Sequence, residues 1–233
     1  MARFLPVLAV LLALMPGAAA RADSAVVVEL FSSQGCSACP PADALLAELA
    51  TRDDVIALAL HVDYWDYIGW ADTFATPQFT RRQYAYARAA GRNMVYTPQM
   101  IIGGNERVMG NEPMRVADLI MSHRDVEYPV QITLSRAGAL ITVEAEAAMA
   151  LPDAPMIVQL VRYAPMQTVE ITRGENAGRT VNYANIVTEW TRIGEWTGAA
   201  PFSLSLRDGR EGPIVAIVQM AGPGRILGAA RLN

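Results

Sequence analysis

The order of hydrophobic and polar positions divides the chain into two regions with different expected secondary structure. Up to residue 125, continuous apolar runs alternate with stretches in which leucine and alanine recur at helical spacing. The runs at 25–31 and 55–62 are rich in β-branched residues, as expected for strands that are buried on both faces. A run at 99–104 ends in Gly-Gly and is followed by 106–110, which predicts a β-hairpin. Helices are predicted at 42–50, 76–91 and 112–124.

After residue 125 the helical spacing disappears, and short runs with strong β character follow one another. Gly, Pro, Asn and Asp separate these runs, which occupy 129–135, 139–147, 156–163, 168–172, 179–187, 201–207 and 213–220. The polar loop RGENAGR at 173–179 is expected to be a solvated hairpin tip. We therefore predict an α/β domain over 23–125 and an all-β, sandwich-like domain over 126–233, with no sheet shared between the two domains.

The first 22 residues indicate the compartment in which the protein acts. A positive start at Arg3 precedes an apolar run over 4–17 that is too short to span a bilayer comfortably. Small residues follow, with Ala20 and Ala22 in an A-x-A pattern. We interpret residues 1–22 as a cleaved secretory signal, with an uncleaved anchor as the alternative. The predicted mature protein is exported, either periplasmic or secreted, and has no stable membrane anchor.

Composition and charge exclude several classes of partner and of catalytic chemistry. Hydrophobic residues make up 52% of the chain and charged residues 18%, which is enough apolar surface for folded cores. The formal net charge of −4 argues against a nucleic-acid partner. Every basic residue is an arginine, so Schiff-base lysine chemistry and the phosphate-binding lysine of a Walker motif are excluded. The only histidines are His61 and His123, a thin supply for a zinc enzyme with three protein ligands.

Both cysteines of the chain, Cys36 and Cys39, lie in a single C-x-x-C pair that follows a predicted strand and precedes a predicted helix. As a structural staple, so short a loop stabilises the fold little. Half a zinc site would need partner ligands that the chain lacks. Thiol chemistry is the interpretation that the position favours, because unpaired N–H groups and the positive end of the helix dipole stabilise a thiolate.

Within the pair we assign the nucleophile to Cys36 and the resolving cysteine to Cys39. Cys36 lies where the strand-to-helix loop meets the helix, so its sulfur is expected to be exposed, whereas that of Cys39 is expected to be shielded in the first turn. A thiolate at Cys39 can attack a mixed disulfide on Cys36 and release the partner. The predicted function is an exported thiol–disulfide oxidoreductase that acts on protein or peptide thiols, with an unidentified redox partner and no cofactor.

The order of these features resembles the thioredoxin superfamily: strand, C-x-x-C at a helix start, helix, strand, and a later Thr-Pro before a hairpin and a final helix. The matching stretch is VYTPQMII at 95–102, which contains Thr97 and Pro98. The resemblance implies that the bond before Pro98 is cis, that it lies beside the cysteine pair, and that the backbone of Thr97 pairs with an extended substrate. An ordinary trans proline before a strand is the alternative.

Four segments together resemble a narrower family of exported thioredoxin-like proteins that is catalogued as a domain of unknown function: ELFSSQGCSACPPAD, HVDYWDYIGW, YTPQMII and RGENAGRT. That resemblance implies a fold and a compartment but no reaction. Thioredoxins carry a buried Asp six residues before the first cysteine, a position held here by Leu30. The nearest acid is Glu29, and one residue along a strand reverses the face. Glu29 is a candidate for proton transfer, with a bond to backbone or to an arginine as the alternative.

The segment HVDYWDYIGWADTF at 61–74 makes the chain before Pro98 longer than a minimal thioredoxin needs. Ligands gather at the carboxyl ends of strands in open α/β sheets, and this segment leaves such an end. We therefore predict that aromatic side chains line a substrate groove beside the thiol, with burial in the core or at the domain junction as the alternative. The candidates are Tyr64, Trp65 and Trp70.

Two other functions would use the same residues. Cys36, Cys39 and His61 would hold Cu(I) in a metallochaperone-like protein, because Cu(I) favours thiolates. Further soft ligands for the copper would come from Met94, Met100 and Met109, although methionines in such runs are common in cores. Without a metal, His61 is expected to be a strand-end histidine whose hydrogen bonds are satisfied. The remaining alternative is a redox-inactive interaction module that retains only the fold.

Overall fold

The structure is a computed structural model, and it describes residues 18–21, 25–124 and 126–233. The predicted secretory signal falls mostly on residues 1–17 and 22, which lie outside the described residues, as does residue 125 at the predicted domain boundary. Of the predicted signal, only Ala18–Arg21 is described, as the short strand β1. No helix among the described residues combines the length and the hydropathy needed to cross a membrane.

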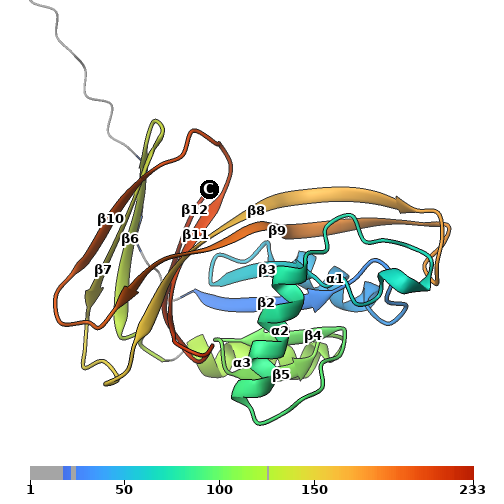
Figure 1. Cartoon of the computed structure of the whole chain (residues 1–233), viewed down its shortest axis with the longest axis horizontal. Helices are drawn as coiled ribbons and strands as arrows, with labels where there is room; N and C mark the ends of the chain where they lie inside the picture. The colour runs from blue at the N-terminus through green and yellow to red at the C-terminus, as the bar shows by residue number, and fades with distance from the viewer. Residues whose placement is uncertain (1–17, 22–24, 125) are drawn as a thin grey trace, which may run out of the picture.

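A large mixed sheet of eight strands runs through the molecule in the order β12-β11-β8-β9-β3-β2-β4-β5 (Figure 1). The first half of the chain contributes β2 (Val26–Ser32), β3 (Val55–His61), β4 (Gln99–Ile102) and β5 (Glu106–Met109). The second half contributes β8 (Met156–Ile171), β9 (Arg179–Trp196), β11 (Ile214–Met220) and β12 (Ile226–Leu232).

Helices cover both faces of the part of the sheet that comes from the first half. They are α1 (Pro40–Leu49), α2 (Pro77–Ala89) and α3 (Pro113–Arg124), with the short 3-10 helix η1 (Asp66–Ile68) before α2. Val28 and Leu30 of β2 belong to the apolar cluster that includes α1 and α3, whereas Val27 and Phe31 belong to the cluster that includes α2. Every residue of β2 is therefore buried, as its continuous apolar run predicts.

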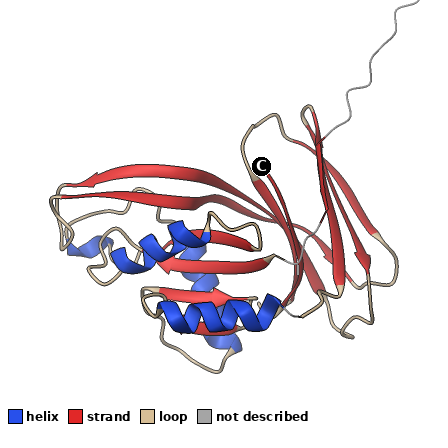
Figure 2. Ribbon diagram, turned by 180° about the vertical axis from the view of Figure 1, so that it is seen from behind, coloured by secondary structure: helices blue, strands red, loops and turns tan. Residues whose placement is uncertain are grey.

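A second, four-stranded antiparallel sheet packs on the far part of the large sheet (Figure 2). Its order is β1-β6-β7-β10, with β6 at Val130–Ala137, β7 at Leu140–Ala147 and β10 at Phe202–Arg207. Alternate residues of β6 and β7, such as Ile132 and Val143, meet Val158 and Ile214 of the large sheet in one apolar cluster. The second half thus has the two-layered packing of a sandwich, as predicted.

The expectation that the two halves share no sheet is wrong. β9 pairs in parallel with β3 through Ala59 and Ile186, which joins both halves into one sheet. The sequence suggested two strands where β8 is a single long one, because Pro165 reads as a strand break. In the structure Pro165 interrupts the β8–β9 ladder only locally, opposite Asn185, whose φ is 48°. Residues 165–185, called the arm below, continue past this point along the first half (Figure 1).

A buried ion pair and its neighbours fix the second half against α2. Glu29 of β2 is fully buried and accepts hydrogen bonds from both Arg82 Nε (2.6 Å) and Arg82 Nη2 (2.8 Å). The Tyr86 hydroxyl donates to the same carboxylate at 2.5 Å and accepts from Gln219 Nε2 of β11 at 2.8 Å. The Arg82 guanidinium also lies 3.7 Å from the ring centroid of Trp190 in β9. These contacts place one charged network at the junction of α2, β2, β9 and β11.

Loss of the Arg82 charge is expected to destabilise the protein strongly, because it leaves the Glu29 carboxylate buried without a counterion. We predict that Arg82→Ala lowers the free energy of unfolding by about 3–5 kcal/mol, measured by urea denaturation. The neighbouring Arg81 is exposed, and Arg81→Ala is the matched control that should change stability little. Equal effects of the two substitutions would show that the network does not hold the halves together.

Candidate functional site

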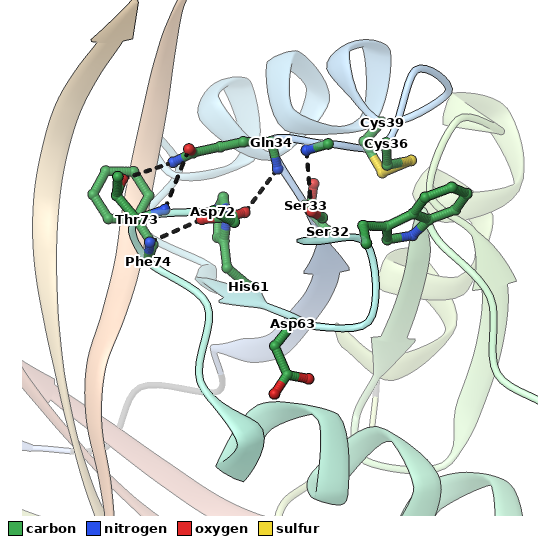
Figure 3. Close-up of polar contacts among 12 residues, drawn as sticks. Ser32, Ser33, Gln34, Cys36, Cys39, His61, Asp63, Asp72, Thr73 and Phe74 are labelled. Atoms are coloured by element: carbon green, nitrogen blue, oxygen red, sulfur yellow. Dashed lines mark hydrogen bonds and ion pairs between the residues drawn. A yellow bond between two sulfur atoms is a disulfide. The ribbon is translucent and has the colours of Figure 1, made fainter. Parts of the chain in front are cut away.

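Cys36 and Cys39 form a disulfide where β2 leads into α1 (Figure 3). Two turns bring the chain to the helix, with the Cys36 amide donating to Ser33 O at 3.1 Å and the Cys39 amide to Cys36 O at 3.2 Å. Cys39 is the N-cap residue, and Pro40 and Pro41 occupy the first turn, where a missing N–H costs nothing. The cysteines are therefore at the helix N-terminus, as the sequence predicted.

The expected difference in exposure between the two cysteines is not present. Cys36 is 1% exposed and Cys39 0% exposed, so the prediction that the Cys36 sulfur is open to solvent is wrong for this disulfide form. Only Ser37 and Ala38, between the cysteines, are exposed. The sequence argument considered the strand, the loop and the helix alone, whereas residues far away in the chain lie against this loop.

The tip of the arm is one of these distant segments. Asn176 Nδ2 donates to the carbonyl oxygens of Gln34 and Cys36, at 2.9 Å in both cases. Asn176 is only 1% exposed, so the prediction of a solvated tip at 173–179 is wrong at this residue. Nothing in the polar loop sequence distinguishes Asn176 from an ordinary turn asparagine, because its partners lie in the other half of the chain.

The predicted aromatic residues divide between two locations. Trp70 Nε1 donates to Gln34 Oε1 at 2.8 Å, and Trp65 Cβ would lie 3.3 Å from a Cβ added at Gly35, so both tryptophans contact the loop before Cys36. The hydroxyl of Tyr64 instead donates to Gln83 of α2 at 3.0 Å. All three side chains are partly buried, and the two tryptophans border the cysteine loop, while their role in a substrate groove stays a prediction.

The Thr97-Pro98 peptide bond is cis, as the thioredoxin resemblance implied. Trp65 Nε1 donates to Thr97 Oγ1 at 2.7 Å, which links the aromatic segment to this loop. A Cβ added at Gly110 would lie 3.1 Å from Pro98 Cβ and 3.0 Å from Ala42 Cβ of α1. The proline therefore lies close to the first turn of the helix that follows the cysteines.

The position of Glu29 does not suit proton transfer to the cysteines. Its side chain lies on the α2 face of the sheet, in the ion pair with Arg82, whereas the neighbouring Leu30 belongs to the apolar cluster on the α1 face. This is the arginine-bound alternative considered from the sequence, and the alternation of side chains along a strand is its cause.

A buried polar cluster on the α1 face was not predicted as a unit. Ser32 Oγ donates to Asp43 Oδ1 at 2.7 Å, and His61 Nδ1 lies 2.7 Å from Asp72 Oδ2. Asp72 also accepts from the amide of Gln34 at 2.7 Å (Figure 3). Among the described residues, Asp43 Oδ2 and His61 Nε2 are buried without a hydrogen-bond partner. His61 is thus only half satisfied, contrary to the expectation of a fully bonded histidine.

The two carboxylates of this cluster have opposite pKa shifts. Burial raises the pKa of Asp43 to about 6, and the nearby His61 and the hydrogen bond from Ser32 offset the burial only in part. Burial also acts to raise the pKa of Asp72, but the hydrogen bonds from His61 and from backbone amides outweigh it and lower the pKa. Asp43 lies four residues after Cys39 on α1, on the same helix face. That i, i+4 spacing was the sequence signal for Asp43.

The copper alternative gains no support from this arrangement. Among residues 18–21, 25–124 and 126–233, no group of three or more His, Cys, Asp or Glu side chains is arranged to hold a metal ion. Met100 is fully buried in the core beside β2, whereas Met94 and Met109 are exposed. The three methionines therefore do not gather at one site.

A family model described as "Protein of unknown function (DUF1223)" matches residues 27–219. The chain belongs to this family. The X-ray crystal structure of protein AGR_C_4864 from Agrobacterium tumefaciens is similar to the whole fold, with a TM-score of 0.78 and 33% sequence identity. The match covers 89% of this chain and 93% of that chain. A search of curated proteins gave no match. Membership of a family of unknown function agrees with the resemblance drawn from the sequence.

A side chain at Gly110 is expected to disturb the packing between Pro98 and α1. A Cβ there would lie within 3.1 Å of Leu30, Ala42 and Pro98, closer than real Cβ contacts normally are. We predict that Gly110→Ala lowers the free energy of unfolding by about 1–3 kcal/mol. Gly209 has open space around its Cβ position and serves as the control for chain entropy. Urea denaturation of both variants gives the comparison, and an undisturbed Gly110→Ala protein would mean that this contact has room to relax.

Proposed function

We propose that the protein is an exported thiol–disulfide oxidoreductase that acts on protein or peptide thiols through Cys36 and Cys39. The observation that carries the proposal is the C-x-x-C disulfide at the N-terminus of α1, with the cis Thr97-Pro98 loop close to the same helix turn. The strands β3-β2-β4-β5, with α1 and α3 on one face and α2 on the other, support a thioredoxin-like first half.

The chemistry is an exchange of two electrons between two pairs of sulfurs. In the reducing direction, the Cys36 thiolate attacks a substrate disulfide, a mixed disulfide forms, and the first substrate thiolate leaves. Cys39 then loses its proton and attacks the Cys36 sulfur, which closes the protein disulfide and releases the second substrate thiolate. The same steps in reverse oxidise a substrate dithiol, and the reduction potentials of the two pairs decide the direction.

Asp43 is the group that we propose as proton acceptor for Cys39, in place of Glu29. It lies one helical turn beyond Cys39, is buried, and has a free carboxylate oxygen. A pKa of about 6 suits a base near neutral pH, because the carboxylate is then mostly ionised but still takes up a proton readily. Besides burial, the groups that act on its pKa are His61 of β3, Ser32 of β2 and Asp72. Asp43 in turn acts to raise the pKa of Tyr183 in β9.

The burial of the cysteines favours a second candidate, a redox-inactive interaction module in which the disulfide is permanent. Both cysteines are buried, and a disulfide exchanges only when a thiolate reaches one of its sulfurs. The two candidates differ in one measurable property, because the oxidoreductase cycles between dithiol and disulfide while folded and the module does not.

The division of labour between the cysteines is tested by trapping. We predict that Cys39→Ser, incubated with a peptide disulfide, accumulates a mixed disulfide on Cys36, because no second thiol resolves it. Cys36→Ser should trap far less, and the double serine variant is the control. Intact-mass spectrometry counts the adducts. Equal adducts in the two single variants would contradict the assigned roles, and a lack of adducts in both would favour the redox-inactive module.

The proposed role of Asp43 predicts a change in pH dependence. In the wild-type protein the resolution of a mixed disulfide should speed up as the pH rises through about 6, where the Asp43 carboxyl ionises. Asp43→Asn should remove this step and slow resolution near neutral pH, which rapid-quench alkylation measures. A wild-type profile that is retained in Asp43→Asn would exclude Asp43 as the base.

The same substitution has a signature in stability that does not depend on redox chemistry. A raised pKa means that the folded protein binds the proton more tightly than the unfolded chain, so stability falls as the pH rises from 3.8, the ordinary pKa of an aspartate, to about 6. Asp43→Asn should flatten the curve of unfolding free energy against pH over this window. Urea denaturation of the wild type and of Asp43→Asn at several pH values measures the difference.

A further inference from the structure

We propose that the tip of the β8–β9 arm, residues 172–178, is a lid over the cysteine pair that has to lift before a thiol reaches Cys36. This inference rests on the proposed function and adds a control of access to it. The lid comes from the second half of the chain. Asn176 contacts the loop that leads to the cysteines, and Gly174 lies against Trp70 in the segment at 61–74.

The closed position leaves no path to the disulfide. Exchange requires an incoming thiolate to reach a disulfide sulfur, and its rate depends on access to that sulfur. Cys36 and Cys39 are 1% and 0% exposed, so the closed protein cannot react at either sulfur. Some covering segment must therefore move in any protein that uses this pair.

The strand and the helix that carry the cysteines are held firmly by the core. Leu30 of β2 and Ala42 and Leu46 of α1 are buried in one apolar cluster with α3. Displacement of this cluster would amount to unfolding of the first half. The segments beside the cysteine loop are better candidates for motion.

The tip has few contacts that hold it closed. Within 172–178, Asn176 is the buried residue, and the only non-glycine apolar side chain, Ala177, is exposed. The base of the arm is anchored, because Tyr183 packs edge-on against His61 with a centroid distance of 5.0 Å and Ile171 is buried. Gly174 and Gly178, with φ of 75° and 82°, lie between this base and Asn176. A segment with few contacts and an anchored base opens locally before the rest of the fold does.

Asn176 is suited to a contact that forms and breaks. Its Nδ2 satisfies two carbonyl groups of the cysteine loop in the closed state. Its Oδ1, however, is buried without a hydrogen-bond partner among the described residues. A buried acceptor without a donor is unfavourable, and lifting the tip exposes this oxygen to water. The closed state thus contains two hydrogen bonds that hold the lid, and one buried oxygen whose unfavourable free energy is relieved when the lid opens.

The lid also lies against residues 61–74 of the first half, called the tryptophan segment here because they contain Trp65 and Trp70. A Cβ added at Gly174 would lie 3.1 Å from Trp70 Cβ. Trp70 and Asn176 both bind Gln34, one through the side-chain oxygen and the other through the main-chain carbonyl. Gln34 therefore connects the lid to the tryptophan segment, and movement of the tip removes one of the contacts that hold the loop before Cys36.

The test measures how fast dithiothreitol reduces the disulfide of the folded, oxidised protein at neutral pH, with the free thiols alkylated and counted by mass spectrometry. Asn176→Ala removes both bonds of the lid, and we expect reduction about ten-fold faster or more than in the wild type. Thr172→Ala, at an exposed position of the same tip, is the matched control and should react at the wild-type rate. Equal rates in all three proteins, including the absence of reduction in all three, would overturn the lid.

A second variant and a urea series distinguish local opening of the lid from a general loss of stability. Gly174→Ala places a methyl group against Trp70 at a backbone conformation that disfavours alanine, so it should loosen the tip without touching Asn176 and should also speed reduction. For each protein the reduction rate is followed at low urea concentrations. Local opening gives a shallow dependence on urea, because little surface is exposed. A dependence as steep as that of global unfolding would show that access comes from unfolding, which also overturns the proposal.

The outcome of this test is separate from that of the proposed function. A lid that opens in Asn176→Ala, combined with a Cys39→Ser protein that traps no peptide, would leave the lid standing and reject the oxidoreductase. Wild-type and Asn176→Ala proteins that are reduced equally fast, combined with efficient trapping, would reject the lid alone.

Discussion

Strand β9 leaves the sandwich of the second half and pairs with β3 at Ala59 and Ile186, and the position of the arm tip beside the cysteine loop depends on this pairing. Because β9 is 18 residues long and β8 is 16, the hairpin that they form reaches from one half of the molecule to the other. Asn185 reinforces the attachment by donating to the carbonyl of Ala57 at 2.9 Å. A long antiparallel hairpin is stiff enough to carry its tip to the cysteine loop, so the second half becomes part of the candidate site.

Buried carboxyl groups lie on opposite faces of the central strands, Glu29 on the α2 face and Asp43 of α1 on the other, and they differ in how completely they are paired. On the α2 face, Arg82 and Tyr86 both bind Glu29 and compensate its charge, and Gln219 of the second half bonds Tyr86, so this network links the halves. On the α1 face, Asp43 has one free oxygen and a pKa raised to about 6 by burial. A fully paired buried charge stabilises the fold, whereas an incompletely paired buried carboxyl with a shifted pKa is a candidate functional group.

The cysteine pair lies at a helix N-terminus, and both of its residues are buried. The helix N-terminus favours a thiolate at this position once the disulfide is reduced. The arm tip and the tryptophan segment cover the same loop and converge on Gln34. The surroundings of the cysteine pair therefore include contacts from both halves of the chain.

The sequence alone determined the local features of this protein: the strands at β2 and β3, the cysteines at the start of α1, and the face of β2 that carries Glu29. These follow from patterns within a few residues, because hydrophobic periodicity, proline and cysteine spacing act through the local backbone. The tertiary structure decided that the halves share a sheet, that His61 pairs with Asp72, and that Cys36 is buried. The Asn176 bond to Cys36 spans 140 residues. A polar loop has no periodicity that encodes a partner so distant, and only the packing of the whole chain selects it.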